Sequence, residues 1–338
     1  MKPEFQLAFL SKLQRLFAEG DFTATYKFAL LIALADLSVE LGHDDNEPLN
    51  LPYRRIGLKF IQLYWQQAAP FTGNDVLIQN LGTQAAVVSS IAAYRRKHPS
   101  QTLNSAQGGK DFQKLLSAVT ATVKLQPVQY IQNLGGDKNV FLFETGQDCV
   151  TLLPGIGYCL RRFQPLVQQL ARSNWLDHIR RNKRNLPLLG KEDDLESFLF
   201  ETPRQALTTI STGLRKINSK CHYCGGTVRE ADVDHFIPHS MYPRDLVHNF
   251  VLAHPSCNRS KSNTLAAKQH LVRWLDFIDI HHNDMREIGF EAGINADAQT
   301  TLSVAHWGYS NALSSGGQAW IESAQYEPIE STYLGLWA

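Results

Sequence analysis

The chain has little of several features that often decide the class of a protein. It contains five cysteines in 338 residues, too few for a disulfide-stabilised secreted scaffold. Its longest apolar run, residues 28–35, is far below the roughly 20 residues that cross a membrane. The first residues, with Lys2 and Glu4, lack a signal-peptide pattern. These absences predict a soluble, cytoplasmic protein with no membrane partner.

An excess of charge of one sign is also missing, because the formal net charge is only +1. Its distribution is uneven. Residues 158–191 hold eight basic side chains against one acidic, whereas residues 274–338 hold nine acidic against one basic. The basic segment, which runs from Arg161 to Lys191, could face phosphate. A solvated helix face accounts for it equally well.

The first half of the chain has mostly helical patterning. Apolar spacing predicts helices at residues 5–17, 26–41, 56–64, 84–97 and 111–125. Three short strands are predicted at residues 128–132, 140–143 and 150–153, the first two joined through Gly135-Gly136-Asp137. We expect a linker at residues 185–194 and a helix over residues 203–217 that leads to Cys221.

Two pairs of soft ligands stand in the second half. Cys221 and Cys224 form one pair and His254 and Cys257 the other, each with two residues between its members. This spacing is typical of a tetrahedral structural Zn²⁺ site. The 29 residues between the pairs are more than a compact zinc ribbon needs. The alternative is that the three cysteines are buried thiols and His254 lies on the surface.

Other polar residues lie between and just after these pairs. Asp234 and His235 follow a predicted strand at residues 227–233, Asn249 precedes a second predicted strand at 250–252, and Asn258 stands in a helix predicted from Ser256 onward. The order strand, loop, strand, helix makes a small unit with little apolar surface. A bound zinc ion would stabilise it.

From about Leu214 to Leu275 the sequence resembles the HNH, or ββα-metal, endonuclease family, in the form that carries an added zinc clamp. The resemblance rests on the Cys-x-x-Cys pair, the Val-Asp-His-Phe-Ile-Pro run, the Tyr-Pro-x-Asp loop and the Cys-Asn-x-x-Lys helix start. It implies that His235 is the general base and that Asp234 and Asn258 hold Mg²⁺ or Mn²⁺. It further implies that Asn249 orients the imidazole or the substrate.

The expected fold class is α+β. We predict a mostly helical targeting domain with a small sheet at residues 1–190, a ββα-metal nuclease domain with structural zinc at 200–280, and an acidic C-terminal extension at 281–338 that packs on the rest. The segments around Tyr64-Trp65 and Trp175 resemble larger bacterial proteins that carry such a nuclease domain at their C-terminal end.

The predicted function is hydrolysis of DNA phosphodiester bonds on a single divalent ion, in bacterial defence or restriction, with the N-terminal domain recognising a DNA mark, a DNA structure or a partner protein. Two alternatives stay open: a zinc-stabilised nucleic-acid-binding subunit of a larger assembly, and a nuclease that cleaves RNA. Double-strand cutting would need two copies, as in a homodimer, or two sequential nicks.

Overall fold

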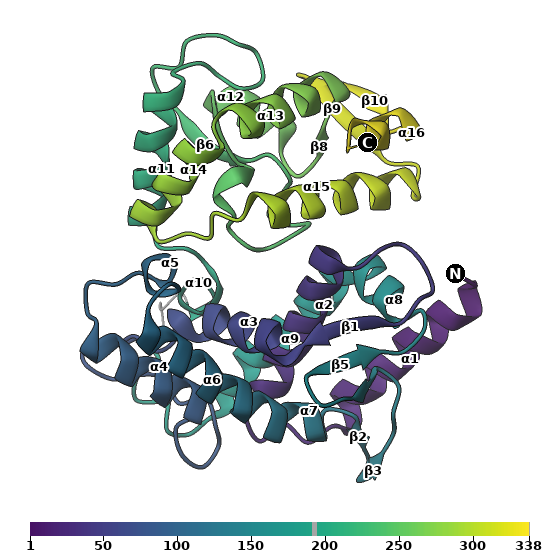
Figure 1. Ribbon diagram of the computed structural model, residues 1–338, viewed down its shortest axis with the longest axis vertical. Helices are drawn as coiled ribbons and strands as arrows, with labels where there is room; N and C mark the ends of the chain where they lie inside the picture. Colours follow the sequence, from purple (N-terminus) through teal and green to yellow (C-terminus); the bar gives the residue numbers. More distant parts are fainter. Residues whose placement is uncertain (191–194, 338) are drawn as a thin grey trace. The chain divides into compact units, whose positions relative to one another are not determined.

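The computed structural model describes residues 1–190 and 195–337 and divides into two compact units. The N-terminal unit comprises Met1–Gln101 and Ala106–Glu201, and the C-terminal unit comprises Thr102–Ser105 and the chain from Thr202 onward (Figure 1). Residues 191–194 of the predicted linker, including Lys191, lie outside the described residues. None of the described helices is both long and apolar enough to span a membrane.

The N-terminal unit is built around one helix that is buried on all sides. In α2 (Tyr26–Leu41) every residue from Tyr26 to Glu40 is buried, because the helix is apolar around its whole circumference. It packs against α3, α8 and α9. The helices of this unit are α1 (Pro3–Glu19), α2, α3 (Tyr53–Trp65), α4 (Ala86–Lys97), α6 (Lys110–Leu125), α7 (Pro127–Tyr130), α8 (Ile156–Arg162), α9 (Gln164–Arg181) and α10 (Leu195–Phe200), with α5 (Leu103–Ala106) at the division between the units.

Five short strands complete the N-terminal unit. The strands β1 (Leu49–Pro52), β5 (Cys149–Leu152) and β4 (Phe143–Thr145) form an antiparallel sheet in the order β1-β5-β4, and β2 (Asn133–Leu134) pairs with β3 (Asp137–Lys138). The predicted helices and the presence of a small sheet are confirmed, but the strand predicted at residues 140–143 lies at Phe143–Thr145. The strand predicted at residues 128–132 is wrong, because α7 begins at Pro127, where proline favours a first helical turn.

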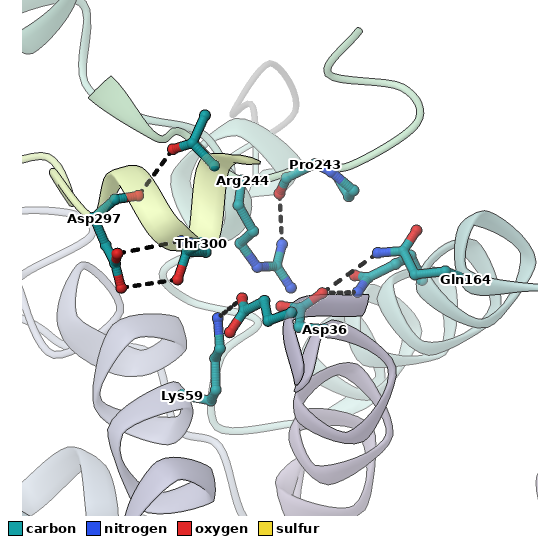
Figure 2. Close-up of polar contacts among 10 residues, drawn as sticks. Asp36, Lys59, Gln164, Pro243, Arg244, Asp297 and Thr300 are labelled. Carbon is teal, nitrogen blue, oxygen red and sulfur yellow. Dashed lines mark hydrogen bonds and ion pairs between the residues drawn. The ribbon is translucent and has the colours of Figure 1, made fainter. Parts of the chain in front are cut away.

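Several buried polar groups of the N-terminal unit pair with one another. Gln164 and Gln168 of α9 donate to Oδ1 of Asp36, at 3.4 and 2.7 Å, and Lys59 forms an ion pair with Glu40 (Figure 2). Arg161 is 3% exposed and donates to Asp44 and to backbone carbonyls near the end of α2. Arg161 therefore stabilises the fold, although the sequence analysis placed it in the basic segment that could face phosphate.

The region of the C-terminal unit that resembles HNH endonucleases is two strands with helices packed on them. Strand β6 (Asp232–His235) pairs antiparallel with β7 (Phe250–Ala253), which places Asp234 opposite Val251 and His235 opposite Phe250. Helices α11 (Arg204–Ile217) and α12 (Pro255–Lys261) both contact β6, and η1 (Val247–Asn249) precedes β7. The predicted strand at residues 227–233 begins later, since Thr227 makes only an isolated bridge with Lys220.

The helix predicted from Ser256 onward is interrupted in the structure. Helix α12 ends at Lys261, where Ser262 takes a positive φ of 51°, and the chain then forms β8 (Leu265–Ala266), α13 (Lys268–Ile280) and α14 (His282–Ala292). The reason is a tertiary contact, because β8 pairs in parallel with β9 (Gln318–Glu322).

The acidic C-terminal residues are part of this unit. Helix α15 (Ala298–Leu313) is capped by Asp297, whose side chain accepts from Thr300 (Figure 2). Strand β9 lies between β8 and β10 (Gln325–Pro328), and α16 (Ser331–Leu334) and η2 (Gly335–Trp337) follow. Trp320 of β9 donates to Ser260 of α12. The end of the chain thus braces the helix that carries Cys257 and Asn258.

Candidate active site and metal centre

The four predicted zinc ligands meet at one point. One ligand atom from each of Cys221, Cys224, His254 and Cys257 lies within 4.8 Å of the others. The first pair sits in a tight turn, in which Gly225 takes a φ of 73° and its N–H donates to the Cys221 carbonyl at 2.9 Å. The second pair stands at the start of α12. His222 N–H donates to Leu252 at 2.8 Å, which fastens the turn to β7.

The hydrogen bonds of His254 prepare it for an ion. Its Nε2 lies 3.1 Å from the Thr227 carbonyl, which can only accept, so the proton belongs on Nε2. Its Nδ1 then carries the lone pair and lies 3.2 Å from the Cys224 sulfur. A backbone carbonyl behind a metal-binding imidazole fixes its tautomer in this way at many sites.

The three neighbouring thiols influence one another's ionisation. Burial, together with the neighbouring Cys221 and Cys224, raises the pKa of Cys257 to about 12. Burial also opposes ionisation of Cys221, but backbone N–H groups outweigh it and lower the pKa of that thiol. A cation would stabilise all three thiolates together. The donor set of three sulfurs and one imidazole fits a structural metal ion of the zinc kind.

Strand β6 and helix α12 face each other through two polar pairs. Residues two apart on a strand share a face, so Asp232 and Asp234 point to the same side. Asn258 donates from Nδ2 to Asp232 Oδ2 at 3.0 Å, and one turn later Lys261 lies 3.0 Å from Asp234 Oδ2. Tyr223 donates to the same Asp234 oxygen at 2.5 Å. The two residues expected to hold the divalent ion therefore have different partners here.

Lys261 is a fully buried charge, with none of its side chain exposed. Burial lowers its pKa, and the Asp234 carboxylate acts in the opposite direction. Its ammonium also donates to the His235 carbonyl at 3.0 Å. One lysine thus fixes both the acid and the backbone of the histidine in the Asp-His pair.

His235 points to the other face of β6 and meets a carboxylate. Its Nε2 lies 2.5 Å from Asp245 Oδ1. Burial would raise the pKa of Asp245, but hydrogen bonds from His235 and Thr202 hold that pKa below its usual value. Asp245 is therefore ionised at neutral pH. His239 lies beside the pair, with its ring centroid 5.0 Å from that of His235.

Asn249 is placed differently from the sequence expectation. Its Oδ1 accepts from Ile237 N–H at 2.7 Å and its Nδ2 donates to the Ile237 carbonyl at 2.9 Å, so both ends of the amide hold backbone. Asn249 is 3% exposed and braces the chain just after β6. The His235 ring instead makes a hydrogen bond with Asp245.

Three site residues were therefore missed from the sequence: Asp232, Asp245 and Lys261. Asp245 lies in the Tyr-Pro-x-Asp loop and Lys261 ends the Cys-Asn-x-x-Lys run, so both stood in motifs that carried the resemblance. Nine residues separate His235 from Asp245, and the path of this loop could not be read from residue spacing.

The fold and the metal centre define an HNH-type nuclease domain, and comparison with known families agrees. The HNH endonuclease family matches residues 221–264, so the predicted resemblance is confirmed and the chain carries an HNH endonuclease domain. A second family, described as a domain of unknown function (DUF8808), matches residues 7–193. Because that match covers more than half of the chain, the chain belongs to this family. No curated protein and no solved structure matches the chain significantly.

Proposed function

We propose that this protein is a metal-dependent endonuclease that hydrolyses DNA phosphodiester bonds, with His235 as its general base. The observation that carries the proposal is the Asp245–His235 pair at the end of β6, inside a domain of the HNH family. A carboxylate paired with an imidazole at 2.5 Å is a common way to hold a catalytic base in one orientation.

The contact of His235 with Asp245 selects the nitrogen that acts as base. An ionised carboxylate accepts hydrogen bonds and donates none, so the proton of the neutral imidazole belongs on Nε2. Nδ1 is then unprotonated and can take a proton from an attacking water. Lys261 holds the His235 carbonyl and Asn249 holds the backbone of Ile237. Both keep the imidazole in place relative to the substrate, which general-base catalysis requires.

The side chains between β6 and α12 fit a hard divalent cation. Tyr223 and Lys261 both engage Oδ2 of Asp234, and Oδ1 makes no hydrogen bond within the described residues. The Asn258 amide nitrogen donates to the Asp232 carboxylate, which leaves the amide oxygen available to an ion. We infer that Asp234 and Asn258 hold Mg²⁺ or Mn²⁺, for which oxygen ligands are suited, with Asp232 orienting Asn258.

Such an ion, when bound, would stabilise charge on the phosphate and on the leaving 3′ oxygen. The protein groups supply the remainder. Nδ1 of His235 accepts the proton of the attacking water, Asp245 stabilises the imidazolium that results, and Lys261 balances the charge of Asp234. Because none of these groups needs a 2′ hydroxyl, the chemistry alone does not separate DNA from RNA.

Cleavage of supercoiled plasmid tests the proposal. The wild type is assayed with Mg²⁺, with Mn²⁺ and with EDTA, and its zinc content is measured before and after, so that loss of the catalytic ion is distinguished from loss of the structural one. His235→Ala should lower the rate by about 10²- to 10⁴-fold. His281→Ala, which removes a histidine that pairs with Asp284 outside the site, should not. Equal cleavage by both variants would overturn the assignment of His235.

Two other functions can be distinguished by the preferred substrate and by the proteins that co-purify with the chain. Faster cleavage of RNA than of DNA of matched sequence would make the protein a ribonuclease. Binding of nucleic acid without cleavage by a zinc-loaded chain, together with stoichiometric partners on purification, would favour a binding subunit of an assembly.

We further propose that the N-terminal unit targets the nuclease to a DNA mark, a DNA structure or a partner protein, in bacterial defence or restriction, and that it works in the cytoplasm. Backbone contacts carry affinity but no sequence information, so the HNH domain needs targeting from elsewhere. The mass of the protein in solution, measured with and without DNA, would distinguish a homodimer that cuts both strands from a monomer that nicks twice.

A further inference from the structure

A second group of metal-binding side chains lies at the active site, apart from the four zinc ligands. His235 is the last residue of β6. His239 follows it by four residues, and Asp245 lies further along the same loop. One ligand atom from each lies within 4.8 Å of the other two. The general-base role proposed above uses His235 and Asp245, but it gives His239 no task.

The chemistry of this group differs from that of the proposed Mg²⁺ site. Two imidazole nitrogens and one carboxylate oxygen are the ligands of zinc and related transition cations, whereas magnesium prefers oxygen alone. Three protein ligands also leave one tetrahedral position for water or phosphate.

The distances allow an ion after a small adjustment. Ligand atoms around a tetrahedral zinc ion lie about 3.4 Å apart, given metal–ligand bonds of about 2.0–2.1 Å. The His235 Nε2 and Asp245 Oδ1 atoms, now 2.5 Å apart, would have to separate by roughly 1 Å. The His235 and His239 rings are tilted by 51° at 5.0 Å, close enough for side-chain rotation to bring their nitrogens onto one ion.

The charges around the group also favour a cation. Asp245 brings a carboxylate to the His235 ring. Asp234, by contrast, already faces the buried ammonium of Lys261. The side chains of His235 and Asp245 are 23% and 11% exposed, so the group remains reachable from solvent.

We propose that His235, His239 and Asp245 form a second metal site that takes a zinc-like transition cation, and that its occupation switches the nuclease off. The ion takes the lone pair of Nε2 on His235, and the ring proton that Nε2 now shares with Asp245 moves to Nδ1. A metal-bound neutral imidazole carries its N–H on the other nitrogen, so Nδ1 has no lone pair left to accept a proton from water. His235 can then no longer act as the general base, while the proposed Mg²⁺ ligands Asp234 and Asn258 remain unchanged. Only the inhibitory consequence rests on the proposed function.

Zinc stoichiometry tests the site without reference to activity. Protein that holds one structural zinc is equilibrated with buffered micromolar Zn²⁺, freed of unbound metal, and analysed for zinc. The wild type should bind two ions per chain and His239→Asn one. His281→Asn, the matched control, should bind two. One ion in the wild type, or two in His239→Asn, would overturn the site.

A cleavage assay with Mg²⁺ tests the switch. Added Zn²⁺ should inhibit the wild type, and His239→Asn should cut at the wild-type rate without zinc but need at least about tenfold more zinc for half inhibition. Loss of cleavage in zinc-free His239→Asn, or unchanged zinc sensitivity, would overturn the switch. If the wild type cuts nothing, the proposed function fails and the inhibition with it, whereas the zinc count still decides the site.

Discussion

The two units of this protein hold their cores together in different ways. In the N-terminal unit the core is the largely apolar helix α2, and its ion pairs include Lys59–Glu40, which is buried, and Arg161–Asp44. In the HNH domain the strands have four residues or fewer, and thiols, histidines and the buried Lys261–Asp234 pair lie around them. The first unit is therefore stabilised mainly by apolar burial, whereas the second depends on its metal ligands.

Removal of the structural metal should have the largest effect and should fall on the C-terminal unit alone. Binding of a structural zinc supplies folding free energy on the order of 10 kcal/mol. Cys221→Ser, or treatment with a strong chelator, should raise hydrogen exchange throughout β6, β7 and α12 and leave α2 protected. Cys159→Ala, a buried thiol of the N-terminal unit, should keep its zinc. Equal loss of protection in both units would break the comparison.

The corresponding test of the N-terminal unit is a core substitution in α2. Leu34 is fully buried, and Leu34→Ala should lower the free energy of unfolding by about 2–5 kcal/mol. Denaturant unfolding followed by exchange in α2 measures the loss. Zinc content should stay at the wild-type value, and a fall in zinc content would show that the two units do not fold independently.

Asp245→Asn sharpens the contrast within the C-terminal unit between groups that maintain the fold and groups that orient the base. An amide can donate to Nε2 of His235 and select the wrong tautomer, so the cleavage rate should fall by about 10²-fold or more. KM should change less than kcat, because the change acts on the base and not on binding of substrate. A matched loss from His281→Asn would contradict this role.

The smallest expected effect concerns His248, which is fully buried. Burial, with smaller repulsion from His282 and Arg286 that is opposed by the His282 backbone and by Asp297, lowers its pKa to about 4 from 6.5. The unfolded chain binds the proton more readily, so this contribution to stability is complete above pH 6.5 and is lost as pH falls toward 4. The loss should be on the order of 2 kcal/mol.

His248→Asn isolates that contribution. Unfolding midpoints of wild type and variant are compared at pH 7 and pH 4.5, since the difference between the two proteins removes the effect of acid on the zinc ligands. The variant should lose less stability on acidification than the wild type does. Parallel losses would show that His248 is not the group responsible.

Much of this molecule could be predicted locally. Helix α2 follows from the largely apolar pattern of residues 26–41, and the zinc ligands follow from two pairs with the same internal spacing. The Val128 region could not be predicted, because its β-branched and aromatic residues favour a strand while Pro127 begins a helix. The helix predicted from Ser256 onward is interrupted for a different reason. Leu265 has helical spacing, yet β9, more than fifty residues later, draws it into a sheet.

The sequence by itself determined the helical nature of the N-terminal unit, the four ligands of the metal centre and the identity of the HNH domain, since each depends on residue types at short fixed spacings. The tertiary structure alone decided which side chains meet around His235. Asp245 reaches it across a loop, Lys261 neutralises Asp234 from α12, and Asn249 turns to the backbone of Ile237. Such contacts depend on the path of the chain through space, which residue spacing does not specify.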